Sequence, residues 1–152
     1  MIPTLIEGSI AIDDRGSVSF VNGFGFAGAP MMPPVRRFYL TRNHRLNFVR
    51  AWHGHKKEWK YVLAVSGSAL VCTVQIDNWG AFANCSAPVN RYILSAALPR
   101  VLAIPPGYAN GWKSLTADCQ LLWFSTATVE ESAADDYRWD ARHWNPWKVE
   151  ER

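Results

Sequence analysis

Two histidines, His53 and His55, are the residues best suited to chemistry, and a single glycine separates them. Side chains two positions apart in a strand share a face, so both imidazoles are predicted to point the same way. Histidine titrates nearest to neutral pH, and basic residues crowd the run from Arg50 to Lys60 around the pair. This pattern favours proton transfer beside an anion. A metal-binding face and two surface histidines without a role are the alternatives.

The elements that must position these histidines are predicted to be short β-strands. Segments rich in β-branched and aromatic residues, mostly bounded by Gly, Pro, Asn or Asp, predict strands at residues 35–41, 46–52, 60–65, 68–77, 91–96, 100–104 and 119–127. One helix is expected at 129–136, where Glu130 and Glu131 suit a helix N-terminus. Seven strands without intervening helical periodicity predict one all-β domain over residues 1–152, as a β-sandwich, jelly roll or small barrel.

Three segments carry expectations about packing. Neither face of residues 68–77 is clearly polar, so both faces are expected to be partly covered. Residues 24–34 form a loop or an arm whose apolar side chains are expected to pack on something, such as a second subunit. Residues 137–147 hold three of the eight tryptophans, and ordinary packing is the expected role of this cluster.

The composition limits the classes of function. The chain has 152 residues, 49% of them hydrophobic, which is enough for one core and excludes overall disorder. Neither a membrane span nor a signal peptide is evident, so no membrane contact and a cytoplasmic location are expected. The three cysteines show no zinc or disulfide spacing. A net charge of +3 without a nucleic-acid-binding signature disfavours nucleic acid, and the local basic cluster fits a phosphate or diphosphate better.

Six short motifs, in the same order, resemble those of the dTDP-4-dehydrorhamnose 3,5-epimerases, which are dTDP-sugar isomerases of the cupin superfamily. The motifs are Asp14-Arg15-Gly16, Arg50-Ala-Trp-His53, Lys60-Tyr-Val-Leu-Ala-Val-Ser-Gly67, Ile76-Asp77, Ile104-Pro-Pro-Gly107-Tyr-Ala-Asn-Gly111 and Asp136-Tyr-Arg-Trp-Asp140. In that family the second motif carries a phosphate-contacting arginine and the catalytic base. The run Arg50-Ala-Trp-His-Gly-His-Lys57 is also similar to that of the dTDP-4-keto-6-deoxyglucose 3,4-ketoisomerases, where both histidines line the active site.

Three positions depart from the epimerase motifs. The tyrosine that serves those enzymes as general acid corresponds to Thr128, whose hydroxyl is a much weaker acid than a phenol. A family histidine is replaced by Asn110, and the carboxylate partner of the catalytic histidine has no evident equivalent. These departures disfavour inversion at two carbons and leave a single-centre epimerase or a ketoisomerase.

The resemblance implies a cupin jelly roll that isomerises a nucleotide-linked 4-keto-6-deoxyhexose, with dTDP as the expected nucleotide, in surface polysaccharide biosynthesis. No cofactor is expected, and a homodimer is expected in which the N-terminal strand or loop reaches the neighbour. The alternative is a catalytically inactive cupin that binds a sugar or nucleotide sugar. The expected catalytic residues are His53, His55 and Tyr39, and the expected substrate-binding residues are Arg15, Arg50, Lys60, Asn110 and Tyr108.

Two further expectations concern geometry within this site. Strict alternation along a strand would place Arg50 opposite His53, so a shared face requires a bulge or bend in the strand. No metal is expected, because two imidazoles, a misplaced Glu58 and the amide of Asn110 make a poor set of ligands for a divalent ion.

Overall fold

The structure, a computed structural model, describes residues 1–22, 34–80 and 83–150. These residues form antiparallel strands and one short helix, which confirms the all-β prediction. The strands are β1 (Thr4–Glu7), β2 (Ser9–Asp13), β3 (Gly16–Phe20), β4 (Arg37–Arg42), β5 (Val49–His55), β6 (Lys60–Ser66), β7 (Ser68–Gln75), β8 (Val89–Ser95), β9 (Arg100–Ile104), β10 (Tyr108–Ser114), β11 (Gln120–Ser125) and β12 (Tyr137–Arg138). The helix is α1 (Val129–Ala134).

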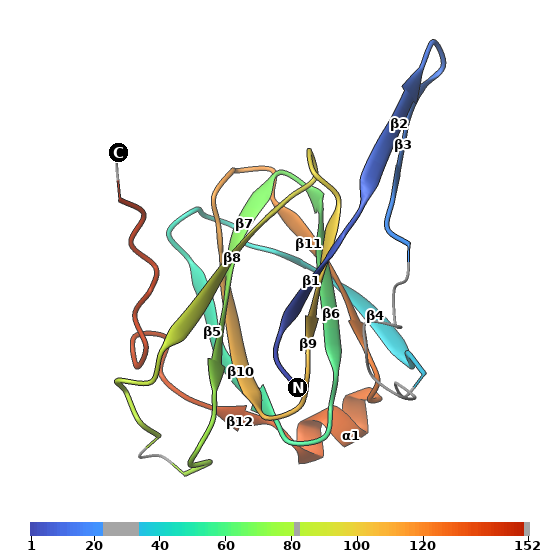
Figure 1. Cartoon of the computed structure of the whole chain (residues 1–152). Coiled ribbons are helices and arrows are strands. Elements are labelled where there is room, and N and C mark those ends of the chain that lie inside the picture. The colour runs from blue at the N-terminus through green and yellow to red at the C-terminus, as the bar shows by residue number, and fades with distance from the viewer. Residues whose placement is uncertain (23–33, 81–82, 151–152) are drawn as a thin grey trace.

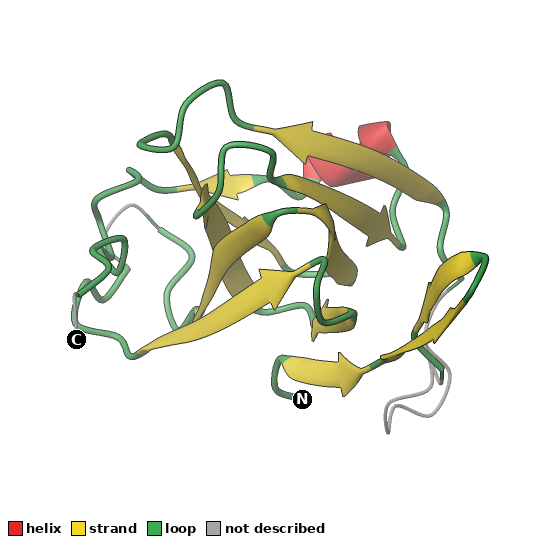
Figure 2. Ribbon diagram, turned by 90° about the horizontal axis from the view of Figure 1, so that it is seen from above, coloured by secondary structure: helices red, strands yellow, loops and turns green. Residues whose placement is uncertain are grey.

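Two five-stranded sheets face each other as a sandwich, as Figures 1 and 2 show. The first sheet has the strand order β1-β9-β6-β11-β4, and the second has the order β12-β5-β10-β7-β8. The helix α1 lies at one end of the sandwich, between β11 and β12 in the chain (Figure 1). After α1 the chain returns to the second sheet, where β12 pairs with β5. This pairing places residues of the C-terminal segment beside the histidines.

A hydrophobic core fills the space between the sheets because successive side chains of a strand point to opposite faces. Val62 and Leu102 from the first sheet meet Val71 and Trp112 from the second, and all four are buried. The turn Ser66-Gly67-Ser68 suggests a β-hairpin from its sequence, but this prediction is wrong: the turn joins β6 of the first sheet to β7 of the second, and the two strands do not pair. Gly67 has a positive φ of 59°, which favours glycine.

The outer face of the second sheet is covered by the C-terminal segment. Leu70, Cys72 and Val74 of β7 are buried there against a cluster that includes Trp139, Trp144 and Trp147. The prediction that both faces of this strand are covered is therefore confirmed, as is the packing role of the tryptophans. The tail is held by Trp52, whose indole Nε1 donates to the carbonyl oxygen of Trp144 at 3.0 Å.

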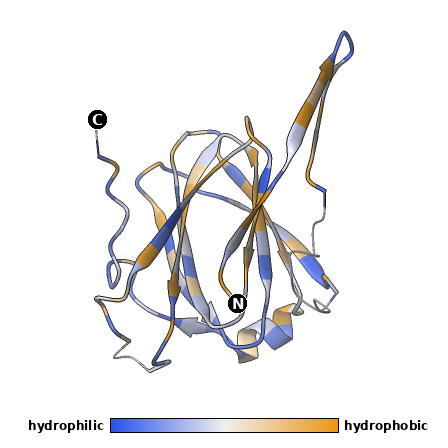
Figure 3. Ribbon diagram, viewed as in Figure 1, coloured by the Kyte–Doolittle hydropathy of each residue, from blue (hydrophilic) through white to orange (hydrophobic). Residues whose placement is uncertain are grey.

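Five strands, among them the two-residue β12, were not predicted from the sequence. Tyr108–Ser114 contains the pair Asn110-Gly111 and follows Gly107, which indicates a turn, but it forms the central strand β10 between β5 and β7. The strands β1 to β3 also lie outside the predicted set. In the described part of the chain, strands β2 and β3 pair only with each other, and they project from the sandwich (Figure 1). Figure 3 shows hydrophobic residues along this hairpin and a hydrophilic tip.

The predicted loop or arm at residues 24–34 falls, except for its last residue, outside the described residues. The predicted helix at 129–136 is confirmed over its first six residues, after which the chain turns into β12. None of the helices in the described ranges is long and apolar enough to cross a membrane.

Candidate functional site

A cavity of about 490 Å³ opens between the two sheets beside His53. Strands of both sheets contribute its lining, which consists of Tyr39, Thr41, Val49, Arg50, Ala51, His53, Lys60, Asn110, Trp112, Trp123 and Arg138. The charged side chains of this lining are Arg50, Lys60 and Arg138, all of them basic. His53 adds a further positive charge only when it is protonated. The cavity is therefore suited to an anionic ligand.

An irregularity in β5 places Arg50 and His53 in the same cavity. Asn110 of β10 pairs with His53, whereas Trp112 pairs with Arg50, so two steps along β10 correspond to three steps along β5. This is the bulge that the spacing of the two residues required, and the prediction is confirmed. Gly111 lies opposite the irregularity, and an added Cβ there would approach the Cβ of Ala51 to 2.4 Å.

His53 has a carboxylate partner, Asp136, in the segment that follows α1. The imidazole Nδ1 lies 3.5 Å from Asp136 Oδ1, and Arg138 Nε donates to Asp136 Oδ2 at 2.7 Å. Burial and the nearby Lys60 lower the pKa of His53, and Asp136 offsets part of that decrease. At neutral pH His53 is therefore mainly the unprotonated imidazole, the form that accepts a proton.

His55 and Lys60 lie deeper, in contact with each other. The Lys60 Nζ is 2.9 Å from His55 Nε2, and both side chains are buried. Both residues, with His53 and Tyr39, also line a smaller adjoining cavity of about 300 Å³ at the α1 end of the sandwich. The two histidines thus face one cavity, as their spacing predicted.

The buried carboxylate Glu58 lies behind this pair. Its Oε1 accepts hydrogen bonds from Ser125 Oγ at 2.7 Å and from Arg37 Nη2 at 3.2 Å. Its Oε2 lies 3.2 Å from His55 Nδ1. Burial by itself would raise the pKa of Glu58, but Lys60 and His55 outweigh it, so the carboxylate stays ionised at neutral pH.

Arg50 and Asn110 are held at the cavity by hydrogen bonds to neighbouring residues. Arg50 Nε donates to Asn43 Oδ1 at 3.0 Å, and the Asn43 amide donates to the carbonyl oxygen of Phe48. Asn110 Nδ2 donates to the carbonyl oxygen of His53 at 2.9 Å, which fixes the amide beside the imidazole. Both residues were predicted as ligand contacts, and both line the cavity.

Tyr39 belongs to an aromatic wall of the same cavity. Its ring stacks on Trp123, with centroids 6.0 Å apart and nearly parallel planes. Burial and the negative charge of Glu58 raise the pKa of Tyr39. The phenol is therefore protonated at neutral pH and can donate a hydrogen bond to a ligand.

Two predicted site residues do not lie at the cavity. Arg15 is at the tip of the β2–β3 hairpin with its side chain 85% exposed, paired with Asp13 at 2.5 Å. Tyr108 is buried in the core between the sheets, because its position in β10 points it into the packed interior. The tyrosine position of the epimerases, Thr128, is the N-cap of α1 and accepts a hydrogen bond from the Glu131 amide. Its role is therefore structural.

Four residues of the site were not predicted, namely Asp136, Arg138, Glu58 as a partner of His55, and Asn43. Asp136 and Arg138 were noted only as parts of a motif near the C-terminus. Their signal was the spacing Asp136-x-Arg138, in which Asp136 directly precedes β12 and Arg138 pairs with His53, because side chains two residues apart in an extended segment share a face. The pairing of β12 with β5 could not be read from the sequence.

The donors at this site do not form a divalent metal centre. No group of three or more His, Cys, Asp or Glu side chains in residues 1–22, 34–80 and 83–150 is arranged to hold a metal ion. His55 directs Nε2 to the Lys60 ammonium, and a second cation at that nitrogen would be repelled. Whether the protein works without metal stays a prediction.

Solved structures with a similar fold are known. The dTDP-4-dehydrorhamnose 3,5-epimerase from Bacillus anthracis, bound to TDP and PPi, matches with a TM-score of 0.74 at 19% identity, over 98% of this chain and 86% of that one. The sugar 3,4-ketoisomerase QdtA from Thermoanaerobacterium thermosaccharolyticum, in complex with TDP, matches with a TM-score of 0.67 at 19% identity, over 90% and 87%. This chain has the cupin fold of the dTDP-sugar isomerases.

A third similar structure is ChmJ, a 3'-monoepimerase from Streptomyces bikiniensis in complex with dTDP-quinovose. It matches with a TM-score of 0.73 at 21% identity, over 90% of this chain and 68% of that one. No protein-family model matches the sequence. No curated protein sequence matches it either. The cupin jelly-roll prediction is confirmed at the level of the fold.

Proposed function

We propose that this protein isomerises a dTDP-linked 4-keto-6-deoxyhexose by removing the proton on the carbon beside the ketone. The observation that carries this proposal is His53, an imidazole with a lowered pKa that contacts Asp136 in a cavity with basic charged residues. The similar solved structures, which are epimerases and ketoisomerases bound to TDP or a dTDP-sugar, support the same class of substrate.

In this proposal His53 is the general base. It accepts the proton from the carbon beside the ketone through the nitrogen that does not face Asp136. Asp136, 3.5 Å from the other nitrogen, stabilises the imidazolium that results. Delivery of a different proton, from solvent or an acid on the opposite face of the same carbon, inverts that centre, and His53 then loses its proton to solvent. If the proton of the hydroxyl on that carbon moves to the former ketone oxygen, and His53 delivers its proton to the former ketone carbon, the ketone is instead shifted by one position.

The oxygen of the ketone gains negative charge as the proton leaves, and Lys60 is the cation best placed to stabilise it. Lys60 lines both cavities, beside His53 and Tyr39. Fixed donors aimed at developing charge in a buried site contribute strongly to the rate. The Tyr39 phenol is a second donor on the same wall. No cofactor is needed, since the ketone itself accepts the electron pair.

Arg50 and Arg138 are assigned to the nucleotide diphosphate. A guanidinium offers a planar pair of donors that matches two phosphate oxygens. Arg50 is held by Asn43, and Arg138 is held by Asp136, so both forks are oriented before a ligand arrives. The proposed biological setting is surface polysaccharide assembly.

Solvent deuterium exchange tests the reaction directly. The protein is incubated in deuterium oxide with dTDP-4-keto-6-deoxyglucose, and deuterium in the sugar is measured by mass spectrometry. Wild type is expected to incorporate deuterium, and His53→Asn is expected to lower the rate by about two to four orders of magnitude. Tight dTDP-sugar binding without incorporation in the wild type would instead favour a catalytically inactive nucleotide-sugar-binding cupin.

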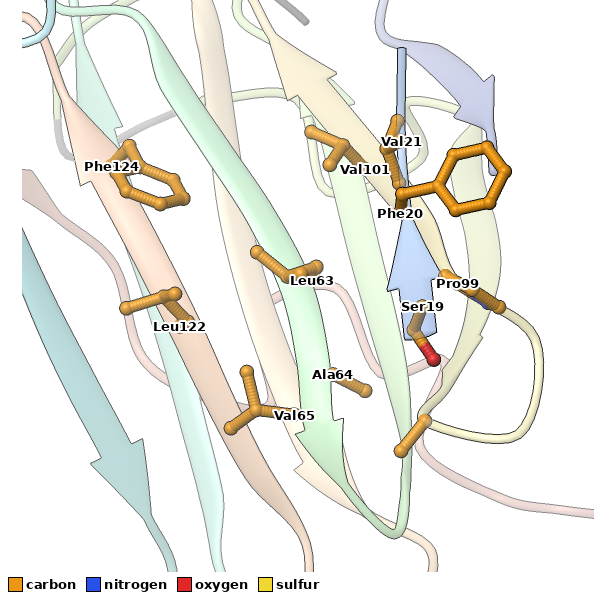
Figure 4. A pocket seen from close by; sticks show the side chains of 11 residues that line it. Ser19, Phe20, Val21, Leu63, Ala64, Val65, Pro99, Val101, Leu122 and Phe124 are labelled. Carbon is orange, nitrogen blue, oxygen red and sulfur yellow. The ribbon is translucent and has the colours of Figure 1, made fainter. Parts of the chain in front are cut away.

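We also propose that the protein is a homodimer, with the outer face of the first sheet as its interface. Phe38 and Leu40 of β4 are 69% and 58% exposed on that face. Beside them lies an apolar groove of about 420 Å³, seen in Figure 4, whose lining includes Leu63, Leu122 and Phe124. A second copy is the expected occupant, because in a two-fold dimer the same patch of each subunit meets its counterpart, and an apolar patch can then bury itself without charge repulsion.

The hairpin β2–β3 supports the same arrangement. An isolated two-stranded hairpin is marginal in water, and this one exposes Ile12 and Val18. Packing on a neighbour would cover these residues. It would also bring Arg15 toward the neighbour's cavity, where Arg15 could contact the diphosphate as predicted.

The oligomeric state tests this proposal, and Leu40→Asp is expected to give monomers in analytical ultracentrifugation. Ile93→Asp, which alters a similarly exposed residue on β8, should stay dimeric; a monomeric wild type would contradict the proposal.

A further inference from the structure

A buried carboxylate, Glu58, organises basic groups behind the proposed active site. Its side chain is 1% exposed, and among the residues that the structure describes the hydrogen-bond donors of good geometry, Ser125 and Arg37, both reach its Oε1. Burying an ionised carboxylate is unfavourable unless charged or polar partners compensate it. The partners of its second oxygen are therefore informative about its role.

The second oxygen faces His55 and fixes the arrangement of its ring protons. Glu58 Oε2 lies 3.2 Å from His55 Nδ1, and within the described residues neither atom has an aligned hydrogen-bond partner elsewhere. An ionised carboxylate only accepts, so the ring proton belongs on Nδ1. The Nε2 nitrogen then presents a lone pair, and this atom is 2.9 Å from Lys60 Nζ.

Lys60 is thereby left with a defined orientation. An ammonium has three donors. One is directed to His55 Nε2, and Glu58 Oε1 lies 3.9 Å away on the same side. Lys60 also lines both cavities next to His53, so the remaining donors are available to a ligand there.

We propose that Glu58 and His55 are positioning residues that hold Lys60 as a charged donor toward the oxygen that gains negative charge in the reaction. The chain Glu58–His55–Lys60 gives His55 a role behind the cation instead of direct contact with the sugar. It also supplies a fixed donor at a site where Thr128 stands in place of a tyrosine. This inference rests on the isomerisation proposed above.

The electrostatics of the cluster agree with this geometry. Burial lowers the pKa of Lys60, and Glu58 opposes that decrease. Burial and the charge of Lys60 lower the pKa of His55, so the ring is neutral at neutral pH and can accept from the ammonium. The other charged or titratable groups that face Lys60 and His55 are Arg37 and Tyr39 from β4, His53 from β5, and Asp135, Asp136 and Arg138 from the segment after α1.

The first experiment measures the pH dependence of deuterium exchange in Glu58→Gln. Loss of Glu58 lowers the pKa of Lys60, so the high-pH limb, where the ammonium loses its proton, should move to lower pH by about one unit or more. The rate at neutral pH should fall about ten- to a hundredfold. Glu130→Gln, on the exposed face of α1, is the matched control and should keep the wild-type profile. A Glu58→Gln rate reduced equally at every pH would overturn the proposal, because that is the signature of a structural role.

The second experiment needs no substrate and separates this inference from the proposed reaction. Long-range proton–nitrogen NMR spectra of the nitrogen-15-labelled protein report the tautomer of each histidine, and His55→Gln identifies the His55 signals. His55 should carry its proton on Nδ1 and should stay neutral at pH 6. A proton on Nε2, or protonation of His55 near its ordinary pKa, would overturn the inference. Absence of deuterium exchange in the wild type would contradict the isomerase alone.

Discussion

Replacing Asp136 with Asn is expected to slow proton abstraction by His53 while leaving the cavity intact. Asparagine has the same shape, but it cannot stabilise the positive charge that His53 acquires. At 3.5 Å and an effective dielectric constant of 20, two unit charges interact by about 5 kcal/mol. About a third of the His53 side chain is exposed, and solvent screening reduces this to about 1–3 kcal/mol. The expected loss in exchange rate is therefore about five- to a hundredfold.

The pH dependence of the exchange rate should shift in a defined direction in Asp136→Asn. Asp136 raises the pKa of His53 against the effects of burial and Lys60, so Asp136→Asn lowers that pKa further. The reaction needs neutral His53, and its rate falls as the pH drops through the His53 pKa. In the variant this low-pH limb should lie at lower pH than in the wild type. The assay is deuterium incorporation from pH 4 to pH 9, in steps of about half a unit.

Asp140→Asn provides the control for this variant. Asp140 lies in the same C-terminal segment, accepts a hydrogen bond from the Arg142 amide, and lines neither cavity. It should exchange deuterium at the wild-type rate. If the low-pH limb of Asp136→Asn stayed in place or moved to higher pH, Asp136 could not be the electrostatic partner of His53. The reasoning from the 3.5 Å contact would then be refuted.

Three other predictions test the ligand, the bulge and the metal. Arg50→Lys keeps the charge but loses the planar fork, so calorimetric titration should show dTDP binding about ten- to a hundredfold weaker than in the wild type. Equal affinity of the wild type for dTDP and thymidine would count against a diphosphate site. Gly111→Ala adds a Cβ that collides with Ala51 and should lower Tm by about 3–10 °C. The control Gly80→Ala meets only the flexible Asn78 side chain and should change Tm little, so similar melting of the two variants would argue against a tight bulge. Dialysis against EDTA should leave deuterium exchange unchanged, and activity that is lost and then restored by a divalent ion would point to a metal cupin.

Sequence patterns predicted most of the strands but not their neighbours. Alternating and β-branched residues identified β4 to β9 and β11, since those signals are local. The strand β10 was missed because Asn110 and Gly111 are typical of turns, and their place between β5 and β7 makes them extended. The bulge in β5 was predicted because Arg50 and His53 are three positions apart. A regular strand would point them to opposite faces, so a site that uses both requires a bulge or bend.

The candidate site was also predicted only in part, because local patterns identify residue types but not long-range pairing. His53, His55, Arg50, Lys60 and Tyr39 were identified from type and motif, and the structure gathers them at adjoining cavities. Asp136 was missed because 82 intervening residues separate it from His53, and a long-range pairing has no local signal. Tyr108 was assigned to the ligand from its motif, although its strand position turns it into the core.

The packing of the C-terminal segment has a consequence for when this site can work. Trp52, next to His53, exchanges backbone hydrogen bonds with Trp139 and is covered by Trp144 and Trp147. Asp136 therefore reaches His53 only after late residues have docked on an early strand. A ribosome releases a chain from its N-terminus onward, so the nascent protein can fold much of both sheets before it has the partner of its base. Activity would thus begin only after this segment has been synthesised and docked, and it would serve as a sensitive reporter of that docking.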